Sequence, residues 1–122
     1  TTGVLLQLPE ALKAAKPQHK PGWTLTTSAR ASVQTIGAHA SHGSSQDVGE
    51  ISWKGGVLPD AWYDEFVIRA TIDSATPQGP LYIPVVQECE RGVDRWIEVP
   101  AAGASGDSLQ KPAPSIRILP KP

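Results

Sequence analysis

The sequence predicts an all-β protein that folds as a single antiparallel β-sandwich. Proline (12 residues) and glycine (11 residues) are spread along the whole chain. Together they make up roughly 19% of it, against an average of roughly 12%, and both are turn formers that disfavour helices. Short runs with a two-residue hydrophobic alternation lie between these turns, as in strands. A length of 122 residues suits one domain with one core.

Three strands are expected in the first part of the chain. Residues 4–8 form an apolar run that Pro9 closes, which predicts a strand. Residues 10–16 have the best helix propensity in the protein, but seven residues between prolines are marginal for a helix, so a strand or irregular edge is at least as well supported. Residues 23–27 alternate large apolar and hydroxyl side chains and predict another strand. Residues 28–49 are expected to form a long polar loop or a loose hairpin.

The middle of the chain carries the clearest strand. Residues 51–53 alternate again, and Gly and Pro then mark turns. Residues 66–72 follow as a strand with four apolar side chains on one face: Phe66, Ile68, Ala70 and Ile72.

The last third is expected to form a hairpin and a final strand. Residues 81–89 predict a long strand that Pro84 interrupts, which implies an edge position or a bulge. A tight turn then returns the chain as a strand over residues 93–99. A loop rich in Gly, Ser and Pro over residues 100–114 precedes the last strand, at residues 115–119. These short strands with regular turns are typical of an antiparallel sandwich.

Charge and hydropathy exclude several classes of function. The net charge is −1, so there is no basic patch for nucleic acid and no polybasic membrane tether. No apolar run reaches the length of a membrane-spanning helix. The chain opens Thr1-Thr2-Gly3 with an apolar strand close behind. We therefore expect a processed or truncated start, with the N-terminal strand segment of the sandwich missing from residues 1–122.

We do not expect an enzyme. The sequence has no nucleophile elbow, Walker A loop, zinc-protease helix or dinucleotide fingerprint. Its one cysteine, Cys89, lies in an apolar strand, where the thiolate that a cysteine hydrolase needs is disfavoured. Cys89 is either a buried free thiol or half of a disulfide whose partner is absent from this chain.

His39 and His42 are a weak candidate for a metal site. They are three residues apart in a Ser/Gly-rich stretch, and Asp47 or Glu50 could complete the ligand set. Such loops do not preorganise ligands, so we expect both histidines to be solvated. Replacing both with Ala should leave any metal stoichiometry unchanged.

Glu65 and Trp96 are the more informative polar positions. If Phe66 faces the core, Glu65 points to the other face of its strand. Trp96 shares a face with Glu98, and we expect this face to be the outer one. The simpler interpretations are a solvated carboxylate and a tryptophan that caps a small core.

Several blocks of the sequence together resemble one family, the YcnI-like copper-binding domain of bacterial envelopes. In chain order the blocks are Lys20-Pro21-Gly22-Trp23, Ile51-Ser52-Trp53-Lys54-Gly55-Gly56, Leu58-Pro59-Asp60 with Tyr63-Asp64-Glu65-Phe66, Val86-Gln87-Glu88-Cys89, Arg95-Trp96-Ile97-Glu98 and Pro112-Ala113-Pro114. They extend over nearly the whole chain. The resemblance implies an immunoglobulin-like or cupredoxin-like sandwich that is exported to the periplasm or the outer face of the membrane.

The resemblance also implies a copper site. In the family's characterised type of site, a mature N-terminal histidine binds Cu(II) through its amine and imidazole, with a carboxylate and a tryptophan nearby. Carried over position by position, the carboxylate is Glu65 and the tryptophan is Trp96. The leading histidine has no counterpart in this chain, so copper occupancy of this chain alone is expected to be low. A cysteine in the family's preceding segment implies a disulfide partner for Cys89.

The sequence thus supports two main hypotheses. The first is an envelope Cu(II) carrier or chaperone without turnover, with another envelope copper protein as its partner. The alternative is a metal-free sandwich that docks on an envelope partner.

Overall fold

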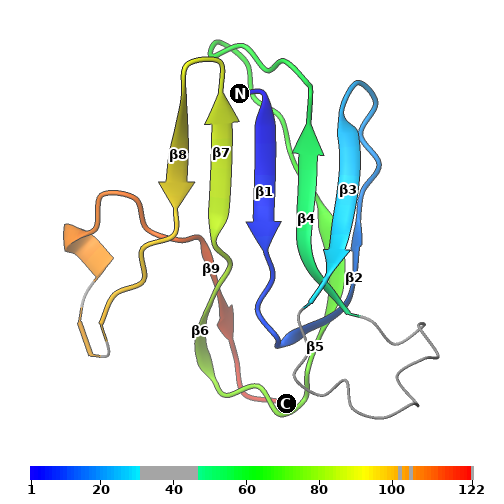
Figure 1. The fold of residues 1–122 in the computed structure, drawn as a ribbon. Helices are drawn as coiled ribbons and strands as arrows, with labels where there is room; N and C mark the ends of the chain where they lie inside the picture. The colour runs from blue at the N-terminus through cyan, green and yellow to red at the C-terminus, as the bar shows by residue number, and fades with distance from the viewer. Residues whose placement is uncertain (31–46, 102, 105, 122) are drawn as a thin grey trace.

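The computed structural model describes residues 1–30, 47–101, 103–104 and 106–121, and these residues form an antiparallel β-sandwich (Figure 1). Its described strands are β1 (Gly3–Gln7), β2 (Leu12–Pro17), β3 (Thr24–Ala29), β4 (Val48–Lys54), β5 (Ile68–Ile72), β6 (Gly79–Tyr82), β7 (Val85–Cys89), β8 (Gly92–Trp96) and β9 (Ser115–Ile118). The described residues hold no helix long and apolar enough to cross a membrane. The all-β class expected from the sequence is confirmed, and residues 10–16 contribute to a strand instead of a helix.

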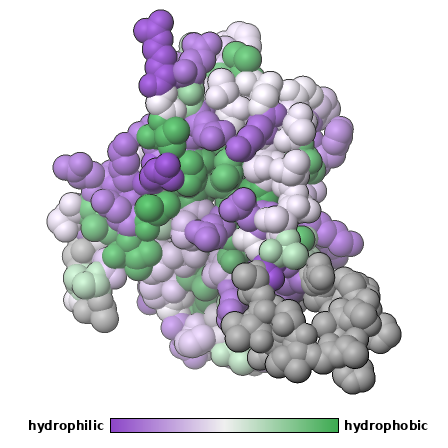
Figure 2. All heavy atoms as spheres, in the orientation of Figure 1, coloured by the Kyte–Doolittle hydropathy of each residue, from purple (hydrophilic) through white to green (hydrophobic). Residues whose placement is uncertain are grey.

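One layer is a five-stranded sheet in the order β3-β4-β1-β7-β8, and the β2-β5 pair packs against it as the second layer, while a third pair, β6-β9, continues beyond the end of β7 (Figure 1). The large sheet faces the viewer in Figure 1, with β2 and β5 behind β3 and β4. Every strand pairing in these sheets is antiparallel. Figure 2 shows the outward face of the large sheet, where apolar residues gather over the β7–β8 side and near-neutral residues cover β3.

The core lies between the two layers and is centred on β1 and β4. Val4 pairs with Trp53 and Leu6 with Ile51, so these four side chains share the inner face. Trp53 and Ile51 are fully buried. The Trp53 indole N–H donates to the carbonyl oxygen of Gln18 at 3.1 Å, so its one polar atom is satisfied. Leu12 and Ala15 of β2 cover these residues from the second layer.

The strand expected over residues 66–72 begins later, at Ile68. Phe66 still packs against the core, as do Ile68 and Ala70, but Ile72 at the end of the strand is exposed. The pairing of β5 with β2 shifts register between Lys13 and Lys16, where the second strand bulges. The bulge inserts one extra residue into β2, so that Leu12 and Ala15, on either side of it, both face the core.

The long strand expected over residues 81–89 is two strands in two different sheets. Pro84 has no N–H to donate, so a ladder cannot run through it. Here the Ile83 N–H donates to the carbonyl of Pro114, and the carbonyl of Pro84 accepts the N–H of Gln7. The chain therefore leaves the β6-β9 pair at Ile83 and joins the large sheet beside β1.

The segment before β9 has more order than the loop expected over residues 100–114. It contains a short 3₁₀ helix, η2 (Gly106–Ser108). Its end is tied to the chain after β8, because Glu98 and Pro112 form an isolated bridge and the Ala113 N–H donates to the Glu98 carbonyl. Ala113 is buried as a result.

Candidate functional site

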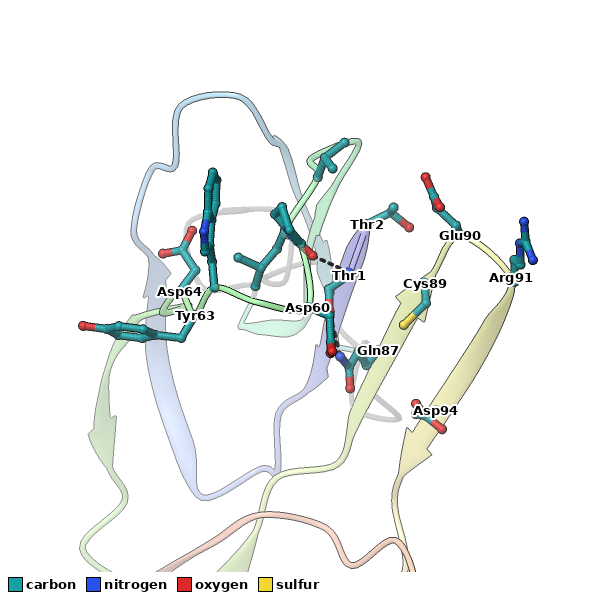
Figure 3. A pocket seen from close by; sticks show the side chains of 14 residues that line it. Thr1, Thr2, Asp60, Tyr63, Asp64, Gln87, Cys89, Glu90, Arg91 and Asp94 are labelled. Carbon is teal, nitrogen blue, oxygen red and sulfur yellow. Dashed lines mark hydrogen bonds between the residues drawn. The ribbon is translucent and has the colours of Figure 1, made fainter.

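A large hollow opens at one end of the sandwich, where three segments meet (Figure 3). These are the start of β1, the exposed loop over residues 57–65, called here the aromatic loop, and the β7–β8 hairpin. Its volume is about 770 Å³. The polar and charged residues that line it are Thr1, Thr2, Asp60, Tyr63, Asp64, Gln87, Cys89, Glu90, Arg91 and Asp94.

Backbone hydrogen bonds hold the aromatic loop against β1. The Thr1 nitrogen donates to the Leu58 carbonyl at 2.8 Å, and the Leu58 N–H donates back to the Thr1 carbonyl at 2.9 Å. The Gly55 N–H donates to the Thr2 carbonyl, and the Trp62 N–H closes a turn on the Pro59 carbonyl. The loop is therefore fixed at both the β1 end and its own tip.

The far wall is the inner face of the β7–β8 hairpin. Gln87 pairs with Val4 on one side and with Asp94 on the other, so both polar side chains lie on the same face as the core residue Val4. The second layer leaves this end of the hairpin uncovered, and these inward-facing groups line the hollow instead of an apolar core.

Trp96 also lies on the inner face, and the expectation that it faces outward is wrong. Its cross-strand partner is Val85, and the next partner along the row is the buried Leu6. Residues directly opposite in an antiparallel sheet share a face, so the indole points toward the core side. The Trp96 indole N–H donates to the Gln87 side-chain oxygen at 3.0 Å, and the Gln87 amide donates to the Thr1 hydroxyl at 2.7 Å.

Trp96 and Asp64 line a smaller hollow of about 400 Å³ that adjoins the large one. Its other walls include Val4, Phe66 and Val85. Glu65 does not line this hollow: it lines another, of about 500 Å³, together with His19 and Lys20, and Asp64 borders both. The structure therefore brings Trp96 together with Asp64, the neighbour of the carboxylate that the sequence selected, and not with Glu65 itself.

Asp64 is electrostatically distinct from its neighbours. The Lys20 ammonium lies 2.6 Å from one carboxylate oxygen, and the Glu65 N–H donates to the other at 2.7 Å. The hydrogen bond from Lys20, followed by that from the Glu65 backbone, lowers the pKa of Asp64 below its ordinary value of 3.8. Asp64 is therefore an anion at neutral pH, and its charge is shared with a lysine.

The comparison with known families identifies the chain. Residues 1–118 match the family described as a domain of unknown function, DUF1775. The chain belongs to this family. DUF1775 is the YcnI-like family, so the resemblance found in the sequence is confirmed.

A solved structure agrees with the assignment of the fold. The chain is similar to an uncharacterized protein from Nocardia farcinica whose crystal structure is described as an immunoglobulin-like fold, with a TM-score of 0.65 and 22% sequence identity. The match covers 96% of this chain and 75% of that one. It supports the immunoglobulin-like sandwich expected for this DUF1775 domain. No curated protein matches the chain.

The remaining candidate residues do not form a metal site within the described part of this DUF1775 chain. Cys89 is a free, half-buried thiol on the wall of the large hollow, and a disulfide to a cysteine outside this chain stays a prediction. His39 and His42 lie outside the described residues. Among residues 1–30, 47–101, 103–104 and 106–121, no group of three or more His, Cys, Asp and Glu side chains could hold a metal ion.

Sequence reasoning missed the part that Gln87 plays. The alternation of Val85, Gln87 and Cys89 along β7 puts an amide on a face that is otherwise apolar or sulfur-bearing. A polar side chain in a core-facing position signals a hydrogen-bonded partner, here the Trp96 indole.

Proposed function

We propose that this DUF1775 protein binds Cu(II) in the bacterial cell envelope and carries it without chemical turnover. The observation that supports the proposal best is that the Trp96 indole and the Asp64 carboxylate share one hollow at the start of β1. A tryptophan and a carboxylate are the two side chains that the family resemblance implies beside the metal. The resemblance also implies export, and the proposal includes an extracytoplasmic location.

The ligand that would bind Cu(II) most strongly is the histidine that the resemblance implies. Cu(II) prefers nitrogen ligands in a tetragonal arrangement, and an amine with an imidazole supplies two of them. Such a histidine would have to reach the hollow from the N-terminal side of Thr1, and Thr1 lines both hollows at this end of the sandwich. The protein's own carboxylate and indole would then complete the set.

The structure offers two carboxylates for this role, and they are distinguishable. Asp64 faces the Trp96 hollow but is paired with Lys20, whereas Glu65 makes no side-chain hydrogen bond or ion pair that the described residues reveal. Glu65 occupies the position carried over from the family. If Glu65 is the ligand, its side chain must turn toward Trp96 to reach the metal. If Asp64 is the ligand, its ion pair with Lys20 must break.

The experiment is a competition titration of Cu(II) against a chelator of known affinity, with the protein carrying any residues that precede Thr1 in its mature form. We expect one equivalent of Cu(II). Trp96→Phe should weaken binding, and so should either Glu65→Gln or Asp64→Asn, depending on which carboxylate is the ligand. Glu10→Gln removes an exposed carboxylate from the β1–β2 turn and serves as the matched control.

Two results would contradict the proposal. One is the absence of Cu(II) binding by the mature protein in the presence of the chelator. The other is one equivalent of Cu(II) whose affinity none of these three substitutions changes, because copper would then be held away from Trp96.

A further inference from the structure

The aromatic loop (residues 57–65) exposes more apolar and aromatic surface than a solvated turn requires. Val57 is 76% exposed, Trp62 71% and Tyr63 89%. Large aromatic side chains are rarely left in water without a use, and Trp and Tyr are enriched among the residues that dominate binding energies at interfaces. In Figure 3 the Tyr63 ring points away from the β7–β8 hairpin.

This loop is held in place before any partner binds. Its backbone is fixed to Thr1 at Leu58 and closed on itself between Pro59 and Trp62. At its far end the Lys20 ammonium bonds both the Asp64 carboxylate and the Glu65 carbonyl. A fixed loop loses little conformational entropy on binding, so its aromatic side chains are suited to serve as anchors.

The surroundings of the loop are acidic. The large hollow beside it is lined by four carboxylates, those of Asp60, Asp64, Glu90 and Asp94, and by one guanidinium, that of Arg91. Lys20 neutralises Asp64, and Lys111 pairs with Asp94. Asp60 and Glu90 then remain against Arg91, which leaves one negative charge in excess in the hollow beside the exposed rings.

We propose that the aromatic loop and the acidic hollow beside it form a docking surface for a cationic segment of another protein. Lysine or arginine side chains of the partner would approach the carboxylates of Asp60 and Glu90. Other side chains of the same segment would lie against Trp62 and Tyr63, where stem packing and cation–π attraction both contribute. An acidic surface also repels the anionic headgroups of a membrane, so a cationic protein is the occupant that the charges favour.

The test uses the protein without metal, in the presence of EDTA, so its outcome is separate from that of copper binding. The probe is a synthetic decapeptide in which Lys and Leu alternate, with capped ends, and the control peptide has Glu in place of Lys. Amide and indole N–H chemical shifts are recorded by NMR during the titration. We expect saturable shifts within residues 57–65 and 87–94 for the Lys peptide alone, with several-fold weaker binding when the salt concentration is raised.

Two pairs of variants locate the binding energy. Trp62→Ala should weaken binding of the Lys peptide by about tenfold or more, as truncation of an aromatic anchor does. Leu119→Ala should not change it, because Leu119 is 68% exposed and directly follows β9, near the C-terminus and far from the start of β1 (Figure 1). Asp60→Asn with Glu90→Gln should weaken binding several-fold, whereas Glu10→Gln should leave it unchanged. All of these side chains are exposed, so the fold is retained and the unperturbed resonances report it.

Several outcomes would overturn the proposal. If the Glu peptide binds as tightly as the Lys peptide, the charge component of the proposal is wrong. If Trp62→Ala binds the Lys peptide with unchanged affinity, the aromatic component is wrong. Concentration-dependent shifts of the loop without peptide would assign the surface to a second copy of the chain. Shifts of the same residues with phosphatidylcholine vesicles in place of the peptide would assign it to a lipid surface.

Discussion

Gly56 supports the aromatic packing beneath the candidate site, and replacing it with alanine should destabilise the protein. Gly56 is buried, and a Cβ built on it would lie 2.0 Å from Cε2 and 2.2 Å from Cδ2 of Trp23. Real Cβ contacts are essentially never shorter than 3.0 Å, so the indole would have to move by about 1 Å.

Trp23 has little room for such a movement. Its ring packs edge-on against Phe66 at a centroid distance of 5.2 Å, and Phe66 packs in the same way against Trp53 at 5.4 Å. Trp53 is fully buried, so the displacement propagates into the core. Overpacking of this kind costs about 1–3 kcal/mol, and we expect Gly56→Ala to fall near the upper end.

The assay is urea unfolding, with thermal unfolding as a second measurement. A loss of about 3 kcal/mol in the free energy of unfolding corresponds to a melting temperature lower by about 10 °C for a domain of this size. Gly92→Ala is the matched control, because Gly92 has no left-handed φ and a Cβ there meets nothing within 4 Å. If Gly56→Ala unfolds at the same urea concentration as Gly92→Ala, the packing argument is refuted.

Three other substitutions test separate parts of the structure. Ala14 has a φ of 52°, so Ala14→Gly should raise the free energy of unfolding by about 1 kcal/mol, and a loss of stability in urea would contradict this. The Arg30 Nη2 atom lies 3.2–3.4 Å from four backbone carbonyl oxygens and shares its two hydrogens among them. Arg30→Met should therefore lower the free energy of unfolding by about 2–4 kcal/mol, and a loss below about 0.5 kcal/mol would argue against it. Lys20→Met should raise the pKa of Asp64 toward 3.8, as followed by NMR of its carboxyl carbon. Because the folded pKa is lowered, the stabilisation from this pair is present above about pH 4 and is lost as the pH falls through the folded pKa, whereas a pH-independent contribution would contradict the assignment.

The sequence predicted most strands because their signal is local. The apolar run at residues 4–8 and the two-residue alternation at residues 23–27 and 51–53 each overlap a strand of the large sheet. The boundaries failed where tertiary hydrogen bonds decide them, as at Pro84, where the chain changes sheets. A proline signals an interruption in the sequence, but only the neighbours of Ile83 and Pro84 show that the two halves belong to different sheets.

The candidate site was less predictable because its geometry depends on register. The alternation around Trp96 assigns neighbouring side chains to opposite faces of the strand, but it does not say which face meets the core. The cross-strand pairing of Trp96 with Val85 shows that Trp96 is on the core face. In the same way, Asp64 and Glu65 are equivalent in the sequence, and the Lys20 contact separates them. Register and long-range ion pairs are set by residues far apart in the chain, which a single sequence does not connect.

Paramagnetic NMR with Cu(II) tests the copper proposal most directly, because it locates the metal. Substoichiometric Cu(II) broadens nearby resonances of the mature protein, and the account predicts that the first to disappear are the Trp96 indole N–H and the amides around Thr1, Asp64 and Gln87. Broadening centred on the segment that contains His39 and His42, with the Trp96 indole signal left sharp, would contradict it.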